Sequence, residues 1–109
     1  MGNNYLCFEM GMRAALEEHG ASFDFKQCAF RYEAVWADSQ PHPTGIPFFI
    51  DGFLNGLDEG GLELLDTDYK QLAERAVVAC ATWLRMPLSI TGEVDSWQSL
   101  VHQNGGYVQ

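Results

Sequence analysis

The residues of this 109-residue chain best suited to chemistry are carboxylates concentrated in its middle. Between Arg31 and Lys70 the sequence has eight acidic residues and no lysine or arginine. The eight are Glu33, Asp38, Asp51, Asp58, Glu59, Glu63, Asp66 and Asp68. A stretch of one charge sign this long cannot neutralise itself locally, so we expect it to face water or a positively charged partner.

Catalytic and metal-binding patterns are missing from the sequence. Neighbouring carboxylates act as acid and base only where burial separates their pKa values, and the sequence gives no sign of such burial for Asp58, Glu59 and Glu63. The Asp66-Thr67-Asp68 pair lacks the spaced ligands of a calcium loop. No glycine-rich phosphate loop or Gly-x-Ser-x-Gly elbow occurs. The cysteines and histidines share no zinc spacing, so we predict neither a metal nor a cofactor; they are Cys7, His19, Cys28, His42, Cys80 and His102.

The composition predicts one globular, cytoplasmic domain over residues 1–109 with a polar tail at 104–109. Nearly half of the residues are apolar, enough for folding without disulfides. Three cysteines and no apolar leader favour reduced thiols. The longest apolar run, Ala76–Ala81, is far shorter than the ~20 residues of a membrane span. The net charge of −9 disfavours binding to nucleic acid or to anionic membranes and favours basic proteins.

Helical patterns occur at both ends of the chain. Met12–His19 is rich in helix formers and is followed by Gly20, which suits a helix end. The segment before it reads as the same helix, begun at Asn3 or Asn4, or as a short strand over Tyr5–Phe8. A helix capped by Asp66, Thr67 or Asp68 is expected to run to about Arg85, with Tyr69, Leu72, Ala76, Ala79, Cys80 and Trp83 on one face. A short final helix is expected near Val94–Gln103.

Strand patterns occur between these helices. Ala21–Phe25 alternates apolar and polar residues, as a half-buried strand does. Ile46–Ile50 reads as a buried strand, and Asp51-Gly52 as the hairpin turn that follows it. Pro47 would then require a sheet edge or a cis peptide bond. Ala29–Ala37 fits both a strand and a helix, and its Ala and Glu content favours the helix.

Three stretches resemble the thioredoxin superfamily, and glutaredoxin most. Met12–Phe25 is similar to the family's first helix and second strand, Thr44–Gly52 to its cis-proline strand and hairpin, and Gly56–Glu59 to the turn that opens the next helix. The resemblance covers roughly residues 4–65. It implies a small α/β domain, a mixed sheet with flanking helices. The alternatives are an α+β fold, or a mainly helical fold with one β-hairpin.

The resemblance also implies a redox function, as the alternative to binding. Glutaredoxins have Cys-x-x-Cys before the first helix, whereas this chain has Cys7-Phe8-Glu9-Met10 and lacks the second cysteine. Cys7 would act alone, beside Pro47, in a monothiol redox or glutathione-binding module. Glu9 would oppose ionisation of the Cys7 thiol. The competing interpretation is that Cys7 is a small buried apolar residue.

The principal prediction is a non-enzymatic acidic protein that docks on a basic surface of a protein partner. Phe53 and Tyr69 would supply apolar contacts beside the acids. Duplex DNA carries one charge per ~1.7 Å, so packed carboxylates would imitate it and inhibit a nucleic-acid-binding protein, as phage anti-restriction, anti-CRISPR and immunity proteins do. The simpler alternatives are a solvated acidic surface and a homodimer formed through exposed aromatics. The predicted contact acids are Asp51, Asp58, Glu59, Glu63, Asp66 and Asp68.

Overall fold

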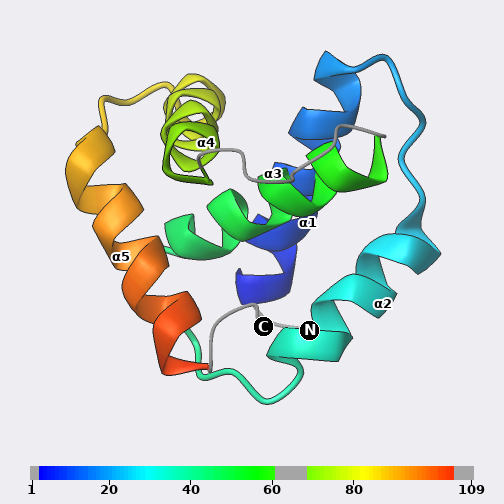
Figure 1. Cartoon of the computed structure of the whole chain (residues 1–109), viewed down its shortest axis with the longest axis horizontal. Helices are drawn as coiled ribbons and strands as arrows, with labels where there is room; N and C mark the ends of the chain where they lie inside the picture. Colours follow the sequence, from blue (N-terminus) through cyan, green and yellow to red (C-terminus); the bar gives the residue numbers. More distant parts are fainter. Residues whose placement is uncertain (1–2, 61–68, 105–109) are drawn as a thin grey trace.

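Five α-helices make up the part of the chain that the computed structural model describes, residues 3–60 and 69–104. They are α1 (Asn3–Glu18), α2 (Phe25–Trp36), α3 (Ile46–Glu59), α4 (Tyr69–Leu84) and α5 (Ile90–Gln103). No strand occurs in those two ranges. The helices form one compact domain, with α3 at its centre and α2 and α5 on opposite sides of it (Figure 1).

The predicted α/β, thioredoxin-like fold is therefore wrong, and so is the predicted β-hairpin. Ile46–Ile50 opens α3, and Asp51-Gly52 continues that helix instead of turning. A short apolar run looks the same in a buried strand and in a buried helix, which explains the error. Pro47 lies in the first helical turn, where its missing N–H breaks no hydrogen bond. No cis peptide bond occurs in the described residues, so Pro47 needs neither a sheet edge nor a cis bond.

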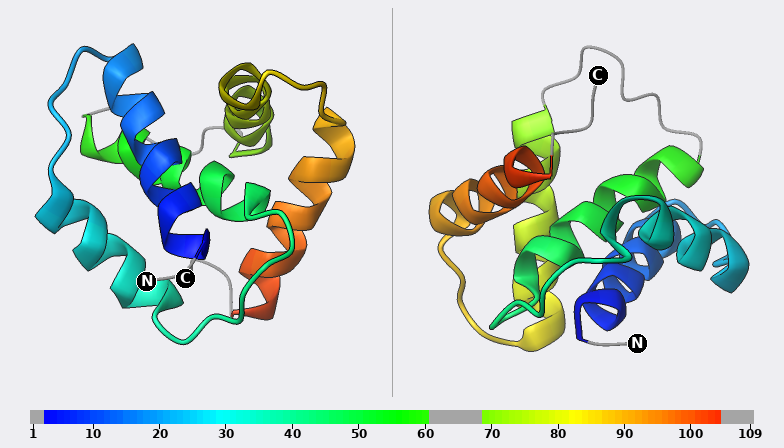
Figure 2. Two further views of the ribbon diagram at one scale, coloured as in Figure 1. Left: turned by 180° about the vertical axis from the view of Figure 1, so that it is seen from behind. Right: turned by 90° about the horizontal axis from the view of Figure 1, so that it is seen from below.

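Helix α3 is largely buried because other helices cover it. Eleven of its 14 residues are buried, from Ile46 through Leu57, so only its last turn reaches water. It packs against α1, α4 and α5, as the front and rear views show (Figures 1 and 2). Two hydrophobic clusters meet at this helix, one with α4 and α5 and the other with α1 and α2.

Glycines bring α1 and α3 into backbone contact. A Cβ atom on Gly11 would lie 2.0 Å from the carbonyl oxygen of Phe49, and one on Gly52 would lie 2.0 Å from that of Phe8. Both distances are far below van der Waals contact, so each position accepts only glycine at this helix separation. The backbones of α1 and α3 therefore approach each other more closely than side chains larger than hydrogen would allow at these two positions.

Local signals explain where the other helices begin. Asp24 accepts hydrogen bonds from the backbone N–H groups of Lys26 and Gln27, and so caps α2. The predicted strand at Ala21–Phe25 is thus the lead-in to a helix, and the helical interpretation of Ala29–Ala37 is confirmed. Ser89 caps α5 by accepting from the Gly92 N–H, so this helix starts before the predicted Val94.

The two longest helices, α1 and α4, agree with their sequence patterns. Helix α1 spans Asn3–Glu18, as one of the two interpretations of that segment predicted. Helix α4 ends at Leu84, one residue before the predicted end. Its predicted cap at 66–68 lies within residues 61–68, outside the described part of the chain.

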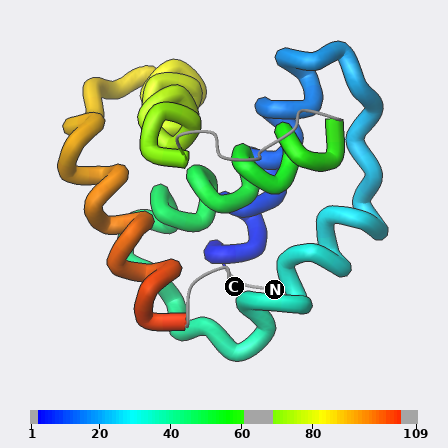
Figure 3. Tube along the Cα trace, in the orientation of Figure 1, coloured from blue at the N-terminus to red at the C-terminus, as the bar shows by residue number. Residues whose placement is uncertain are grey.

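A buried asparagine fixes the connection between α2 and α3. Asn4 donates from Nδ2 to the carbonyl oxygen of Gln40 over 2.7 Å, and its Oδ1 accepts from the His42 N–H over 3.0 Å. The connection passes beneath α3 near the last turn of α5 (Figure 3). His42 then accepts at Nδ1 from the Gly45 N–H, which leads the chain into α3.

Candidate functional site

Asp51, predicted as a surface acid, lies in the core. Only 1% of its surface is exposed, and its two carboxylate oxygens accept hydrogen bonds from two tryptophans. The Nε1–H of Trp36, on α2, donates to Oδ2 over 2.7 Å, and the Nε1–H of Trp97, on α5, donates to Oδ1 over 3.3 Å. Asp51 thus joins the two outer helices through α3 and cannot belong to a docking surface.

The environment of Asp51 changes its ionisation. Desolvation raises its pKa to about 6, and the two indole hydrogen bonds limit this rise by stabilising the carboxylate. A perturbed carboxyl is often catalytic, but a catalytic group must reach substrate. With both oxygens occupied and no solvent access, Asp51 has a structural role.

Asp58 and Glu59 share one cation of the protein itself. Arg31 of α2 contacts Asp58 and Glu59 through its two terminal nitrogens, each over 3.0 Å, and also donates to Asn55 over 3.2 Å. These pairs join α2 to the end of α3. The two acids are therefore partly neutralised before any partner arrives.

The structure does not bring the predicted contact set together. Phe53 is fully buried, so it cannot act as an exposed contact, whereas Tyr69 is 41% exposed. Asp51 is internal, and Glu63, Asp66 and Asp68 lie outside the described residues. Of the predicted surface, only Asp58, Glu59 and Tyr69 are both described and accessible.

Cys7 is a half-buried thiol packed against both hydrophobic clusters. Its sulfur lies beside Gly45, where an added Cβ would approach it to 2.4 Å. Desolvation raises the pKa of Cys7, whereas a reactive cysteine needs a lowered one. Pro47 is itself buried in the first turn of α3. The monothiol alternative gains no support from this geometry.

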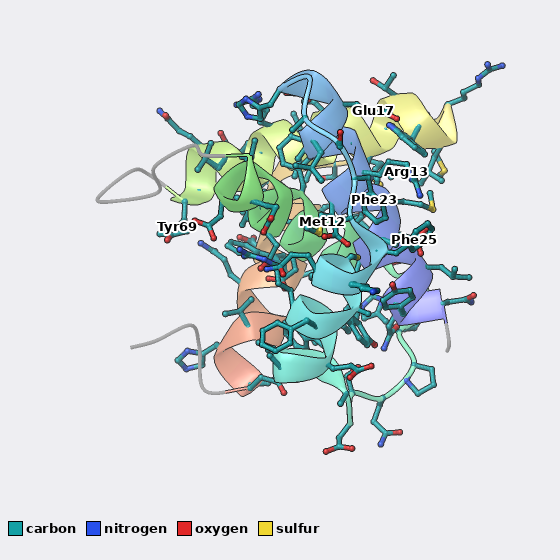
Figure 4. All side chains as sticks on the ribbon, turned by 90° about the vertical axis from the view of Figure 1, so that its right-hand side faces the viewer. Met12, Arg13, Glu17, Phe23, Phe25 and Tyr69 are labelled. Carbon is teal, nitrogen blue, oxygen red and sulfur yellow. The ribbon has the colours of Figure 1, made fainter. Side chains whose placement is uncertain are left out.

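An aromatic and cationic cluster covers the connection between α1 and α2. The guanidinium of Arg13 lies 4.2 Å from the ring centroid of Phe23 and 5.5 Å from that of Phe25, and it also pairs with Glu9. Figure 4 shows Phe23 and Phe25 beside Arg13, Glu17 above them, and Tyr69 at the opposite side of the view. Arg13 is therefore a second arginine, after Arg31, whose charge is engaged by contacts within the protein.

A groove separates α1 from α4 on the surface of the domain. It has a volume of about 470 Å³, and its lining comes from one turn of α1 and from two turns of α4. Arg75 of α4 crosses to Glu18 of α1 with a hydrogen-bonded ion pair and also lies 5.8 Å from the ring of Phe53. The lining residues are Ala14, Glu17, Glu18, Arg75, Val78, Ala79, Thr82 and Trp83.

Sequence reasoning did not identify this groove. Trp83 was assigned to the buried face of α4, but it is 41% exposed, and Val78 is 53% exposed. The apolar residues of α4 cover a wider arc than the face that α3 and α5 bury. Val78 lies outside the predicted apolar stripe, and this apolar residue at a solvent-facing position was the feature of the sequence that could have indicated the groove. Glu17 lies outside the acidic middle third, so the charge pattern does not point to it.

The comparisons with known proteins give no assignment. No family model, no curated protein and no solved structure matches the chain. Among the described residues, no helix is both long and apolar enough to span a bilayer. The same residues contain no group of three or more His, Cys, Asp or Glu side chains placed to hold a metal ion.

Proposed function

We propose that this protein is a non-enzymatic acidic binding protein whose partner is a protein with a basic surface. The observation that supports the proposal is the excess of unpaired negative charge. Three of the six lysines and arginines, namely Arg13, Arg31 and Arg75, are paired with carboxylates of the chain itself. The chain has fifteen acids against six lysines and arginines, so most of its negative charge has no cation of the protein to neutralise it.

Several exposed acids have no ion pair within the described residues. Glu17 lies on α1, Glu33 on α2, Asp38 just after α2, and Asp95 on α5. They are distributed over three different helices and the connection after α2. Such a field accelerates encounter with a basic partner, and a shaped contact must then supply specificity.

The test is binding of an oligolysine peptide at several salt concentrations. We expect E17Q, E33Q, D38N and D95N together to weaken binding and to flatten its salt dependence, since each removes one unpaired charge. The matched control is Q103N combined with S96T, N104Q and Q98N, which changes four exposed polar side chains but no charge. Equal binding by the acid variant, or binding that ignores salt, would contradict the proposal.

Inhibition of a nucleic-acid-binding protein is the more specific form of this proposal. It concerns Glu63, Asp66 and Asp68 as well, because carboxylate density decides how well a protein competes with phosphates. The measurement is displacement of duplex DNA from an oligolysine-coated surface. We expect the wild type to displace DNA and a triple variant, E63Q with D66N and D68N, to require a higher concentration.

A further inference from the structure

The α1/α4 groove has the shape and lining of a protein-binding site. Helices α1 and α4 both pack firmly on α3 but touch each other little, so a channel remains above α3 between them. The close α1–α3 contact at Gly11 and Gly52 holds one wall in a fixed position. Hydrophobic packing of Ala73, Ala76 and Val77 holds the other. A groove between two fixed walls needs little rearrangement to bind.

The α4 wall presents two apolar side chains to solvent. Val78 is 53% exposed and Trp83 is 41% exposed, although both belong to a helix with a well-buried opposite side. The ring of Trp83 packs on Phe49 at a centroid distance of 6.4 Å, which orients it. A fixed, half-exposed tryptophan beside a depression is the kind of residue that dominates binding energy in interfaces.

One end of the groove is negative. Glu18 is paired with Arg75, but Glu17 has no ion pair within the described residues. Both acids lie in the last turn of α1, where the helix dipole places partial negative charge and no basic residue is present. A bound segment would therefore be stabilised by a lysine or arginine at this end.

The length of the groove indicates the type of occupant. From Arg75 to Trp83 the wall covers eight residue steps of α4, roughly 12 Å at 1.5 Å per residue. That distance matches a little over two turns of a helix, which present apolar side chains at positions i, i+4 and i+7. A small ligand that needs full enclosure fits less well, because the groove is open to solvent.

We propose that the α1/α4 groove binds an amphipathic helix of a partner protein, with apolar side chains against Val78 and Trp83 and a basic residue next to Glu17. This inference rests on the proposed function and adds the location and type of the contact. The groove supplies the specificity that the distributed surface charge cannot.

The probe is a synthetic helical peptide with leucines at i, i+4 and i+7 and lysines elsewhere. Its control has the same lysines with glutamine in place of leucine. V78N removes an exposed apolar contact of the groove, and V35N removes a similarly exposed valine of α2 (44% exposed) as the matched control. Both changes conserve charge, and a retained helical circular dichroism signal shows that each variant folds.

We expect V78N to weaken binding of the leucine–lysine peptide roughly tenfold and V35N to change it less than about twofold. E17Q should reduce its salt dependence more than E33Q does. Equal effects of V78N and V35N would overturn the groove assignment. Concentration-dependent self-association that V78N abolishes would overturn it too, because the occupant would then be a second copy.

The two proposals fail in different ways. Binding of oligolysine but not of the leucine–lysine peptide would reject the groove and leave the acidic binding function intact. Loss of binding to both probes would reject both. Equal binding of the leucine peptide and its glutamine control would also reject the groove, since charge alone would then explain the contact.

Discussion

At the scale of single residues, Asp51 is the most consequential side chain of the core. It is a carboxylate in an apolar interior, and it persists there because two indole N–H groups reach it from different helices. Removing the carboxylate would leave both N–H groups buried without that acceptor, which costs about 1–3 kcal/mol for each group. The negative charge of Asp51 lowers the stability of the fold at neutral pH, because burial disfavours the ionised carboxylate.

The pH dependence of stability follows from that raised pKa. In the folded protein Asp51 has a pKa of about 6, against an ordinary value of 3.8. Folding therefore favours the protonated form, and the contribution of Asp51 to stability falls as pH rises from about 4 to about 6. The fall is on the order of 3 kcal/mol, and it is complete above pH 6.

The D51N variant tests this prediction. Because asparagine does not ionise, the difference in unfolding free energy between wild type and D51N should favour wild type most near pH 4 and shrink towards pH 7. Urea unfolding at intervals between these values measures it, and the subtraction cancels the other carboxylates. A difference that stays constant would show that Asp51 keeps an ordinary pKa, and one that grows with pH would show a lowered pKa; either outcome would contradict the prediction.

The identity of charged residues was readable from the sequence, but their surroundings were not. Asp51 and Asp58 look alike in a list of acids, yet one is internal and the other pairs with Arg31. The partners Trp36, Trp97 and Arg31 come from distant parts of the chain, so only the tertiary fold reveals them. The candidate groove could not be predicted from the sequence for the same reason, because residues of α1 and α4 form it together.

At the scale of elements, the α1–α3 contact determines the geometry of the domain. Gly11 and Gly52 each face a backbone carbonyl of the opposite helix. The long amphipathic helices α1 and α4 could be predicted from periodicity, since one face of each is polar. Helix α3 could not, because it opens with the continuous apolar run Ile46–Ile50, which suits a buried strand as well as a buried helix.

Substitution of one of these glycines should destabilise the whole fold. We expect G52A to lower the unfolding free energy by more than the 1–3 kcal/mol typical of overpacking, because its Cβ would meet a backbone atom that cannot rotate away. In G60A the added Cβ would lie no closer than 3.3 Å to its neighbours. Thermal unfolding of both variants measures the contrast, and equal melting temperatures would contradict the packing argument.

The connection between α2 and α3 offers a second test at this scale. Asn4 is buried, and its amide makes two backbone hydrogen bonds to that connection. We expect N4A to cost about 1–3 kcal/mol and to increase amide hydrogen exchange at residues 40–45 specifically. Exchange that rises evenly over all helices would indicate a general loss of stability instead.

At the scale of the whole molecule, the protein combines a rigid apolar centre with an acidic exterior. Its own arginines are used to join helices: Arg31 connects α2 to α3, and Arg75 connects α4 to α1. Few cations remain to offset the surface acids. The overall acidity, the single small domain and the lack of a recognisable catalytic motif were all visible in the sequence, and they are the basis of the binding function proposed above.

The fully covered position of α3 has a consequence for synthesis in the cell. Helices leave the ribosome in chain order, so α3 emerges before α4 and α5, and Ile50, Leu54 and Leu57 lack part of their final surroundings at that moment. A chain that ended near residue 60 would leave this apolar helix without its α4 and α5 neighbours, and exposed apolar surface of this kind favours aggregation.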